Sequence, residues 1–337
     1  MALTSASFLR PVVFFANGIG DHLVTLPAIR ALSTLFSGRI SLVCLADARE
    51  LFFGDVEFQN VWRIPFLGGA DHTRRLFEAP RLFDSFLHRQ PGAQSFDVDA
   101  LRDTIGSCDL FMVLTEWDSV DIAALRDVLA PRISIGPFAG YTHQLTREPV
   151  HAIDRPFSCP RLFEPEIDPA SYSTPPLMGA PGSILAKQLR RAMGPDQHLL
   201  TVHTDTKARK MWSARKFLET IEGFLDCRPD FIAVIVGQRH GMCLPESKHA
   251  NRIFDFCRIP LGLTFSVVQN SSLFLGIDSC MLHVSDLARV PGVGLFGPTS
   301  PKVWGFRFAR HVHLMGVDGD LDSSSVVNAL LSMSPPS

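Results

Sequence analysis

The chain has 337 residues, of which 46% are hydrophobic and 20% carry a charged side chain, a composition typical of a compact globular protein. This length exceeds what one hydrophobic core usually organises, so we expect two domains. The formal net charge of −2 leaves no positive excess to neutralise a nucleic-acid backbone, so no nucleic-acid partner is expected.

The cysteines and the apolar runs bear on the compartment. Seven cysteines are scattered along the chain without a C-x-x-C pair, which argues against a disulfide framework or a zinc site and favours a reducing environment. Neither a secretory leader pattern nor an apolar run of membrane-span length is present. We therefore expect a cytoplasmic protein without a transmembrane segment.

The first half alternates short apolar runs with helical patterns. Apolar runs at 12–16, 40–45, 110–114 and 132–135 predict buried strands. Residues 21–36 carry apolar side chains at helical spacing and predict a helix, with Pro27 in its first turns, where proline is tolerated. The chain thus begins with a strand, a tight turn and a helix.

Prolines gather between residues 149 and 195, and the alternation then restarts. We expect an N-terminal domain at 1–170, a connection at 171–195 and a C-terminal domain at 196–337. Parallel strands need crossover helices, so two such halves predict two parallel sheets with ligands beyond the carboxyl ends of their strands. In the second half the predicted strands are 199–202, 231–236, 273–276 and 293–296, and the predicted helices are 214–225 and 281–288.

A glycine-containing turn at residues 17–22 joins the first predicted strand to the first helix. Glycines let a ligand approach backbone amides closely, and a helix N-terminus favours anions. Three interpretations are open. Asp21 caps or charges the first helical turn; the turn is an incomplete dinucleotide fingerprint, with Asp47 as the ribose-binding acid and Leu23 in place of the third glycine; or the Asp21 carboxylate accepts a proton from a substrate hydroxyl.

Two further strand ends carry polar side chains. The segment 202–212 combines hydroxyls with Lys207, Arg209 and Lys210, which predicts a diphosphate-binding loop; the alternative is a solvated basic loop. The segment 276–283 places small and hydroxyl residues at a helix start, where amides bind phosphate oxygens. The alternative there is ordinary helix capping, with a locally hydrogen-bonded histidine.

In chain order, these segments resemble the motifs of glycosyltransferase family 9, the heptosyltransferases of lipopolysaccharide core assembly and their relatives. The resemblance spans positions 17 to 299, most of the chain. It is carried by residues 17–21 with Leu26-Pro27-Ala28, similar to G-D-x-x-x-x-x-P; by Lys210-Met211-Trp212, similar to K-x-W; by residues 278–283, similar to D-S-G-x-x-H; and by residues 295–299.

The resemblance implies a GT-B fold, in which two Rossmann-like domains with parallel sheets face a central cleft. It also implies inverting, metal-independent transfer without a cofactor from a nucleotide-sugar, typically ADP-heptose, bound mainly by the C-terminal domain. Asp21 is then the general base on the acceptor, and Lys210 faces the donor phosphates. The other donor-binding residues expected are Gly20, Thr204, Thr206, Lys207, Gly237, Asp278, Ser279, Cys280, Met281, His283 and Thr299.

This sequence also departs from the family pattern. Cys280 stands where the family usually has glycine, which puts the identity of the donor in doubt because a side chain there could crowd a phosphate. The family's ribose-contacting acid has no clear counterpart, and Glu246 is the candidate for it. Asp97 and Asp99 have D-x-D spacing, but their polar surroundings indicate a solvated loop.

The acceptor cannot be read from the sequence, because residues 62–103, which we expect to shape its site, carry no motif. A saccharide, a lipid-linked saccharide, a natural product or a protein all remain open. Two other functions remain as alternatives: a non-catalytic nucleotide-sugar-binding or scaffold protein of the same fold, and a nicotinamide-dependent dehydrogenase.

Overall fold

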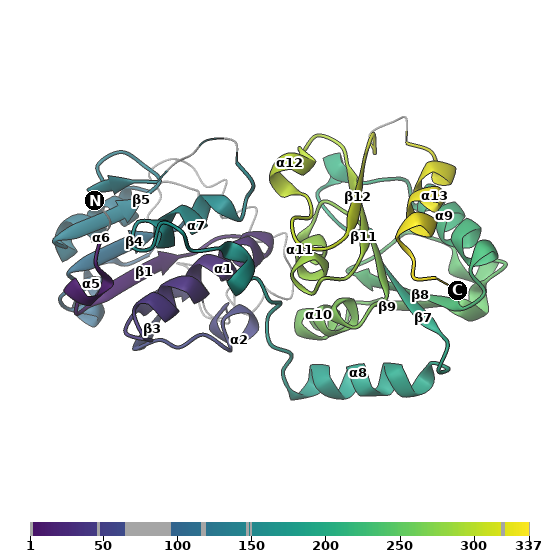
Figure 1. Ribbon diagram of the computed structural model, residues 1–337, viewed down its shortest axis with the longest axis horizontal. Helices are drawn as coiled ribbons and strands as arrows, with labels where there is room; N and C mark the ends of the chain where they lie inside the picture. Colours follow the sequence, from purple (N-terminus) through teal and green to yellow (C-terminus); the bar gives the residue numbers. More distant parts are fainter. Residues whose placement is uncertain are drawn as a thin grey trace. The chain divides into compact units, whose positions relative to one another are not determined.

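The computed structural model describes residues 3–45, 48–64, 96–115, 119–145, 148, 150–317 and 321–336. The chain divides into two compact units, Met1–Leu177 and Met178–Ser337. Each unit holds a six-stranded sheet with helices packed against it (Figure 1). The predicted α/β class with two parallel, Rossmann-like sheets is confirmed.

Unit 1 is built on a sheet of strand order β3-β2-β1-β4-β5-β6, in which every neighbouring pair is parallel. Its strands are β1 Pro11–Phe15, β2 Ser41–Leu45, β3 Asn60–Ile64, β4 Leu110–Val113, β5 Ile133–Gly136 and β6 His143–Gln144. Its helices are α1 Ile19–Leu35, α2 Ala48–Phe52, α5 Val98–Ile105, α6 Val120–Leu129 and α7 Asp154–Arg161, with short 3-10 turns η1 Ser5–Ser7 and η2 Pro169–Tyr172.

Unit 2 repeats this design with strand order β12-β11-β10-β7-β8-β9, again parallel throughout. Its strands are β7 His198–His203, β8 Phe231–Gly237, β9 Ile253–Cys257, β10 Leu273–Ile277, β11 Gly292–Phe296 and β12 His311–Met315. Its helices are α8 Ala180–Ala192, α9 Ala214–Cys227, α10 Leu261–Gln269, α11 Cys280–Leu287, α12 Pro301–Trp304 and α13 Ser323–Met333, with turns η3 Ala208–Lys210, η4 Leu244–Glu246 and η5 Ala250–Arg252.

The central strands are apolar on both faces because helices cover both, as in other parallel sheets. All five residues of β1 are buried, as are all five of β10. In unit 2, α9 and α13 pack together, and α8 packs against α10 (Figure 1). The two central strands of each sheet therefore end at fixed positions, where the predicted turns begin.

Three local expectations differ from the structure. Pro27 lies in the third turn of α1 rather than in its first turns, and the helix persists because residues 22–33 are buried, so tertiary packing outweighs the lost hydrogen bond. The expected loop at Asp97 and Asp99 is instead the start of α5: the Asp97 side chain caps this helix by accepting from Ala100 N at 3.0 Å. The 171–195 connection contains α8, whose Pro181 sits in the first turn, where proline is tolerated.

Within the described part of the chain, none of the helices combines the length and hydrophobicity that a bilayer crossing requires.

Candidate functional site

The first candidate region is the turn from β1 into α1, which holds Asp21. Gly18 N donates to Asp21 Oδ2 at 3.1 Å, so the carboxylate is held in the first turn of α1 while remaining partly exposed. Gly20 is the second residue of the helix. One carboxylate oxygen therefore has a capping role, and a carboxylate with two oxygens can combine this role with contact to a substrate hydroxyl.

Two buried polar atoms near Asp21 have no hydrogen-bond partner. The Asn17 side chain is 3% exposed, and its Oδ1 is unpaired. His22 is fully buried between the Phe15 and Phe52 rings; its Nδ1 donates to Gly18 O at 2.8 Å, and its Nε2 is unpaired. Burial lowers the pKa of His22 to about 4, so the ring is neutral at pH 7.

Lys210 forms an ion pair with the turn between β10 and α11 in unit 2. Lys210 Nζ lies 2.6 Å from Asp278 Oδ2, which also accepts from Thr299 Oγ1 at 2.5 Å. The two ion-pair side chains are 17% and 5% exposed, and Thr206 Oγ1 donates to the backbone carbonyl of Asp278 at 3.1 Å. Asp278 therefore holds the ammonium group in place, and the ammonium has further N–H donors for an anion.

The register of the sheet explains why these residues meet. β10 pairs with β7, with Gly276 opposite His203, and with β11, with Ile277 opposite Leu295. Three segments that are distant in sequence therefore leave the same edge of the sheet side by side. This brings together the regions of Thr206, Asp278 and Thr299, which belong to three of the sequence segments singled out above.

His203 is a site residue that the motif reasoning missed. It is the last residue of β7, is 4% exposed, and its Nδ1 lies 2.9 Å from Ser279 Oγ. Its position immediately before Thr204, at a strand end, was the available signal. Thr204 is buried, and its Oγ1 is 3.5 Å from Arg239 O, which ties the ends of β7 and β8 together.

Gly237 ends β8 with φ +129°, a backbone conformation that favours glycine. A Cβ there would lie 3.3 Å from both Asp205 Cβ and the His203 ring. Asp205 Oδ2 in turn accepts from Gln238 N at 3.3 Å. Glycine is needed at this position because the neighbouring strand ends approach it closely.

The remaining residues of the D-S-x-x-x-H segment differ in placement. Met281 and His283 are buried, and the His283 ring lies 6.4 Å from that of Trp304. Cys280, the first residue of α11, is partly buried; desolvation raises its pKa to about 12, although its thiol contacts the backbone N–H groups of residues 280 and 281. A neutral thiol therefore occupies the place of the family glycine. Lys207 is exposed.

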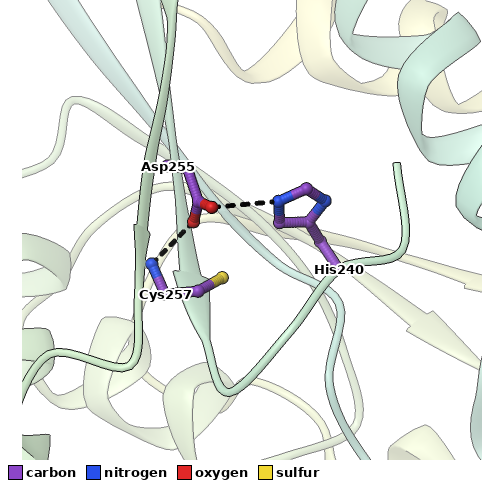
Figure 2. Close-up of side chains that lie close together, drawn as sticks. All are labelled: His240, Asp255 and Cys257. Carbon is purple, nitrogen blue, oxygen red and sulfur yellow. Dashed lines mark hydrogen bonds and ion pairs between the residues drawn. The ribbon is translucent and has the colours of Figure 1, made fainter. Parts of the chain in front are cut away.

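One group of side chains in the described part of the chain has the composition of a metal site. Ligand atoms of His240, Asp255 and Cys257 lie within 4.8 Å of one another (Figure 2). Their hydrogen bonds argue against a metal. Met242 N donates to His240 Nδ1 at 2.9 Å, which assigns the ring proton to Nε2, 3.3 Å from Asp255 Oδ2. A metal at Nε2 requires that nitrogen to be deprotonated, so we assign the group to hydrogen bonding.

Three sequence expectations concern other parts of the chain. Glu246 is exposed in η4 and hydrogen-bonds the Cys243 thiol; a ribose contact of this residue stays a prediction. Asp47, the acid of the dinucleotide interpretation, lies outside the described residues, as does most of the expected acceptor segment 62–103.

Comparisons with known proteins agree with this architecture. No protein-family model matches the chain. It is 24% identical over 270 residues to lipopolysaccharide heptosyltransferase 3 of Escherichia coli K12, covering 72% of this chain and 76% of that protein. A glycosyltransferase family 9 structure from Veillonella parvula is 17% identical, with 98% of each chain covered and a TM-score of 0.73. An E. coli heptosyltransferase solved with ADP is 18% identical, covering 96% of this chain and 100% of that one, with a TM-score of 0.63.

The two parallel α/β units are those of the GT-B glycosyltransferases. The chain is similar in sequence to a heptosyltransferase and in fold to structures of glycosyltransferase family 9, in agreement with the resemblance that the motifs predict.

Proposed function

We propose that this protein transfers a heptose from ADP-heptose to a hydroxyl of a saccharide acceptor, with inversion and without a metal. The observation that carries the proposal is the partly buried Lys210–Asp278–Thr299 cluster at the carboxyl edge of the unit 2 sheet, beside the start of α11. Carboxyl edges of parallel sheets bind ligands, and a fixed cation beside a helix N-terminus suits a diphosphate.

The donor half of the proposal concerns the leaving group. As the bond from the anomeric carbon to the phosphate oxygen breaks, ADP departs with the electron pair, and negative charge grows on its diphosphate. Lys210, held by Asp278, and the amides of α11 stabilise this charge where a metal would otherwise act. The other donor contacts that we propose come from Gly20, Thr204, Thr206, Lys207, Gly237, Ser279, Cys280, Met281, His283 and Thr299.

The acceptor half assigns Asp21 as the general base. Its carboxylate takes the proton of the acceptor hydroxyl while that oxygen attacks the anomeric carbon, a contribution of about 10²–10⁴-fold in rate. The support is its place in the first turn of α1 with one oxygen on Gly18 N. Asp21 belongs to unit 1 and Lys210 to unit 2; we assign the acceptor hydroxyl to Asp21 and the donor phosphates to Lys210.

The names of similar proteins support the choice of substrates. The sequence relative is a lipopolysaccharide heptosyltransferase, and one structure of the same fold was solved with ADP. We therefore propose ADP-heptose as the donor and the saccharide part of lipopolysaccharide as the acceptor. All seven cysteines are free, which fits a reducing cytoplasm as the compartment.

The test is a transfer assay with ADP-heptose and lipopolysaccharide that lacks its outer heptose, read by the mass of the product. We expect one heptose to be added in the presence of EDTA. Wild-type protein that binds ADP in calorimetry but transfers no sugar would instead support the non-catalytic alternative. A rate that depends on an added divalent metal would contradict the metal-independent step.

Asp21→Asn tests the general base in the same assay. The amide oxygen still accepts from Gly18 N, so α1 keeps its first turn, while the proton acceptor is lost. We expect transfer to fall about 10²–10⁴-fold with ADP affinity unchanged. Asp127→Asn, at an exposed acid of α6 in unit 1, is the matched control and should keep the wild-type rate. Near-normal transfer by the Asp21 variant would remove this residue from the role.

A further inference from the structure

Ser279 stands at the N-cap position of α11 but does not cap the helix. Its backbone is extended (φ −162°, ψ 174°), and its hydroxyl makes no capping hydrogen bond. Serine at this position usually accepts from a backbone N–H in the first turn. Instead, Ser279 Oγ lies 2.9 Å from His203 Nδ1, so the histidine holds the hydroxyl away from the helix.

The position of His203 is fixed by its neighbours. Its backbone pairs with Gly276 of β10 on one side and with Val236 of β8 on the other. The ring lies so close to Gly237 that a Cβ there would be 3.3 Å from Cδ2 and Nε2. Burial lowers the pKa of His203 to about 4, so at pH 7 the neutral ring acts by hydrogen bonding rather than by charge.

We propose that His203 is a positioning residue for the diphosphate of the donor: its Nδ1–H donates to Ser279 Oγ, directs the serine hydrogen to a phosphate oxygen and keeps the serine from competing for the first N–H groups of α11. This inference rests on the proposed function, because it assigns the anion at this site to a nucleotide donor. It gives His203 a specific role that the motif residues do not supply.

The direction of the His203–Ser279 hydrogen bond follows from the ligand. If the serine hydroxyl donated to Nδ1, only its lone pairs would face the phosphate, and they would repel the anion. If Nδ1–H donates, the hydroxyl hydrogen is available for a charge-assisted bond, which is stronger than a neutral one. A bound diphosphate therefore selects the histidine tautomer that carries its proton on Nδ1.

The test measures ADP affinity by calorimetry in the full-length chain. His203→Leu removes the Nδ1–H group that donates to Ser279. Loss of one hydrogen bond to a charged group corresponds to about 10- to 100-fold weaker binding of ADP. In His203→Asn, the side-chain Nδ2 lies near the place of Nδ1, so we expect affinity to return to within severalfold of wild type. The glutamine side chain of His203→Gln has no N–H group at the place of Nδ1. We therefore expect this variant to bind ADP as weakly as the leucine variant does.

A histidine on the edge strand β12 supplies the matched control. His311 is exposed, so His311→Leu should bind ADP as the wild type does. Unchanged ADP affinity in a folded His203→Leu protein would overturn the inference while leaving the proposed function intact. Wild-type protein that does not bind ADP would overturn the proposed donor, and the inference with it.

A double-mutant cycle separates positioning from packing. If His203 acts through Ser279, then Ser279→Ala weakens ADP binding and adding His203→Leu weakens it no further. Fully additive losses would contradict action through the serine. A readout that does not depend on measured affinities is the ¹⁵N spectrum of the imidazole in the ADP-free and ADP-bound protein. We expect Nδ1 to be protonated with ADP bound, and an unprotonated Nδ1 in that complex would overturn the proposed tautomer.

Discussion

The turn after β1 and the turn after β10 each follow a central strand of their sheet, yet their polar groups are satisfied differently. After β10, Asp278 accepts from Lys210 and Thr299, and Ser279 bonds His203. After β1, the Asn17 Oδ1 and His22 Nε2 atoms are buried without partners. The polar groups after β10 are thus paired with one another, whereas the turn after β1 retains unmet hydrogen-bonding capacity.

This difference has a physical consequence. A buried network with its partners in place is costly to break, because removing one member leaves another without compensation. A buried polar atom that already lacks a partner has incurred its desolvation cost, so removing it loses no hydrogen bond. Loss of a side chain should therefore lower the stability of the fold at the turn after β10 and leave it nearly unchanged at the turn after β1.

The largest expected effect is at Asp278. Asp278→Ala leaves the Lys210 ammonium, 17% exposed, without its carboxylate, and we expect unfolding free energy to fall by about 3 kcal/mol. Asp278→Asn keeps an acceptor for both neighbours and should lose less. Urea unfolding of unit 2 measures both. Arg215→Ala, which removes an exposed i,i+4 pair with Glu219, should change stability by less than about 0.5 kcal/mol; equal losses in the Asp278→Ala and Arg215→Ala proteins would contradict the contrast.

Buried histidines allow a pH comparison of the two units. Burial lowers the pKa of His22 in unit 1 and of His203 in unit 2 to about 4, so the unfolded chain binds these protons first as pH falls below 6.5. Stability from each neutral histidine is therefore complete above pH 6.5, and about 2 kcal/mol of it is lost by pH 5.

Calorimetric melting of the wild-type protein between pH 7 and 5 checks this expectation, since the range lies above the titration of most carboxylates. His22→Leu should flatten the pH dependence of the unit 1 transition and leave that of unit 2 unchanged. A variant that keeps the wild-type slope for unit 1 would show that His22 does not supply it.

The smallest expected effects compare one side chain from each turn. Thr206→Val removes the hydroxyl that donates to Asp278 O and should cost about 1 kcal/mol. Asn17→Ala removes an unpaired carbonyl, so the relieved desolvation should offset the lost contacts and leave stability unchanged within about 1 kcal/mol. Thermal unfolding measures both; a loss above about 2 kcal/mol in the Asn17 variant would mean that its amide supports the fold.

The amino-acid pattern alone was sufficient for the two-unit α/β architecture. Buried strands are read directly from short apolar runs: the run at 12–16 corresponds to β1 Pro11–Phe15, and that at 273–276 to β10 Leu273–Ile277. The turns after these strands follow, because local backbone preferences and the position of glycine are encoded within a few residues. The edge strand β9 Ile253–Cys257 was missed, since Asp255 interrupts its apolar run.

Tertiary structure alone decided how the site is connected. The sequence named Lys210, Asp278 and Thr299 as members of separate motifs, but their sharing of one carboxylate oxygen depends on sheet register across 89 residues of chain, from Lys210 to Thr299. The pairing of His203 with Ser279 has the same origin, because β7 and β10 are neighbours in the sheet although the two residues are 76 positions apart in the chain. Hydrogen bonds between distant segments depend on strand order, and no local preference encodes strand order.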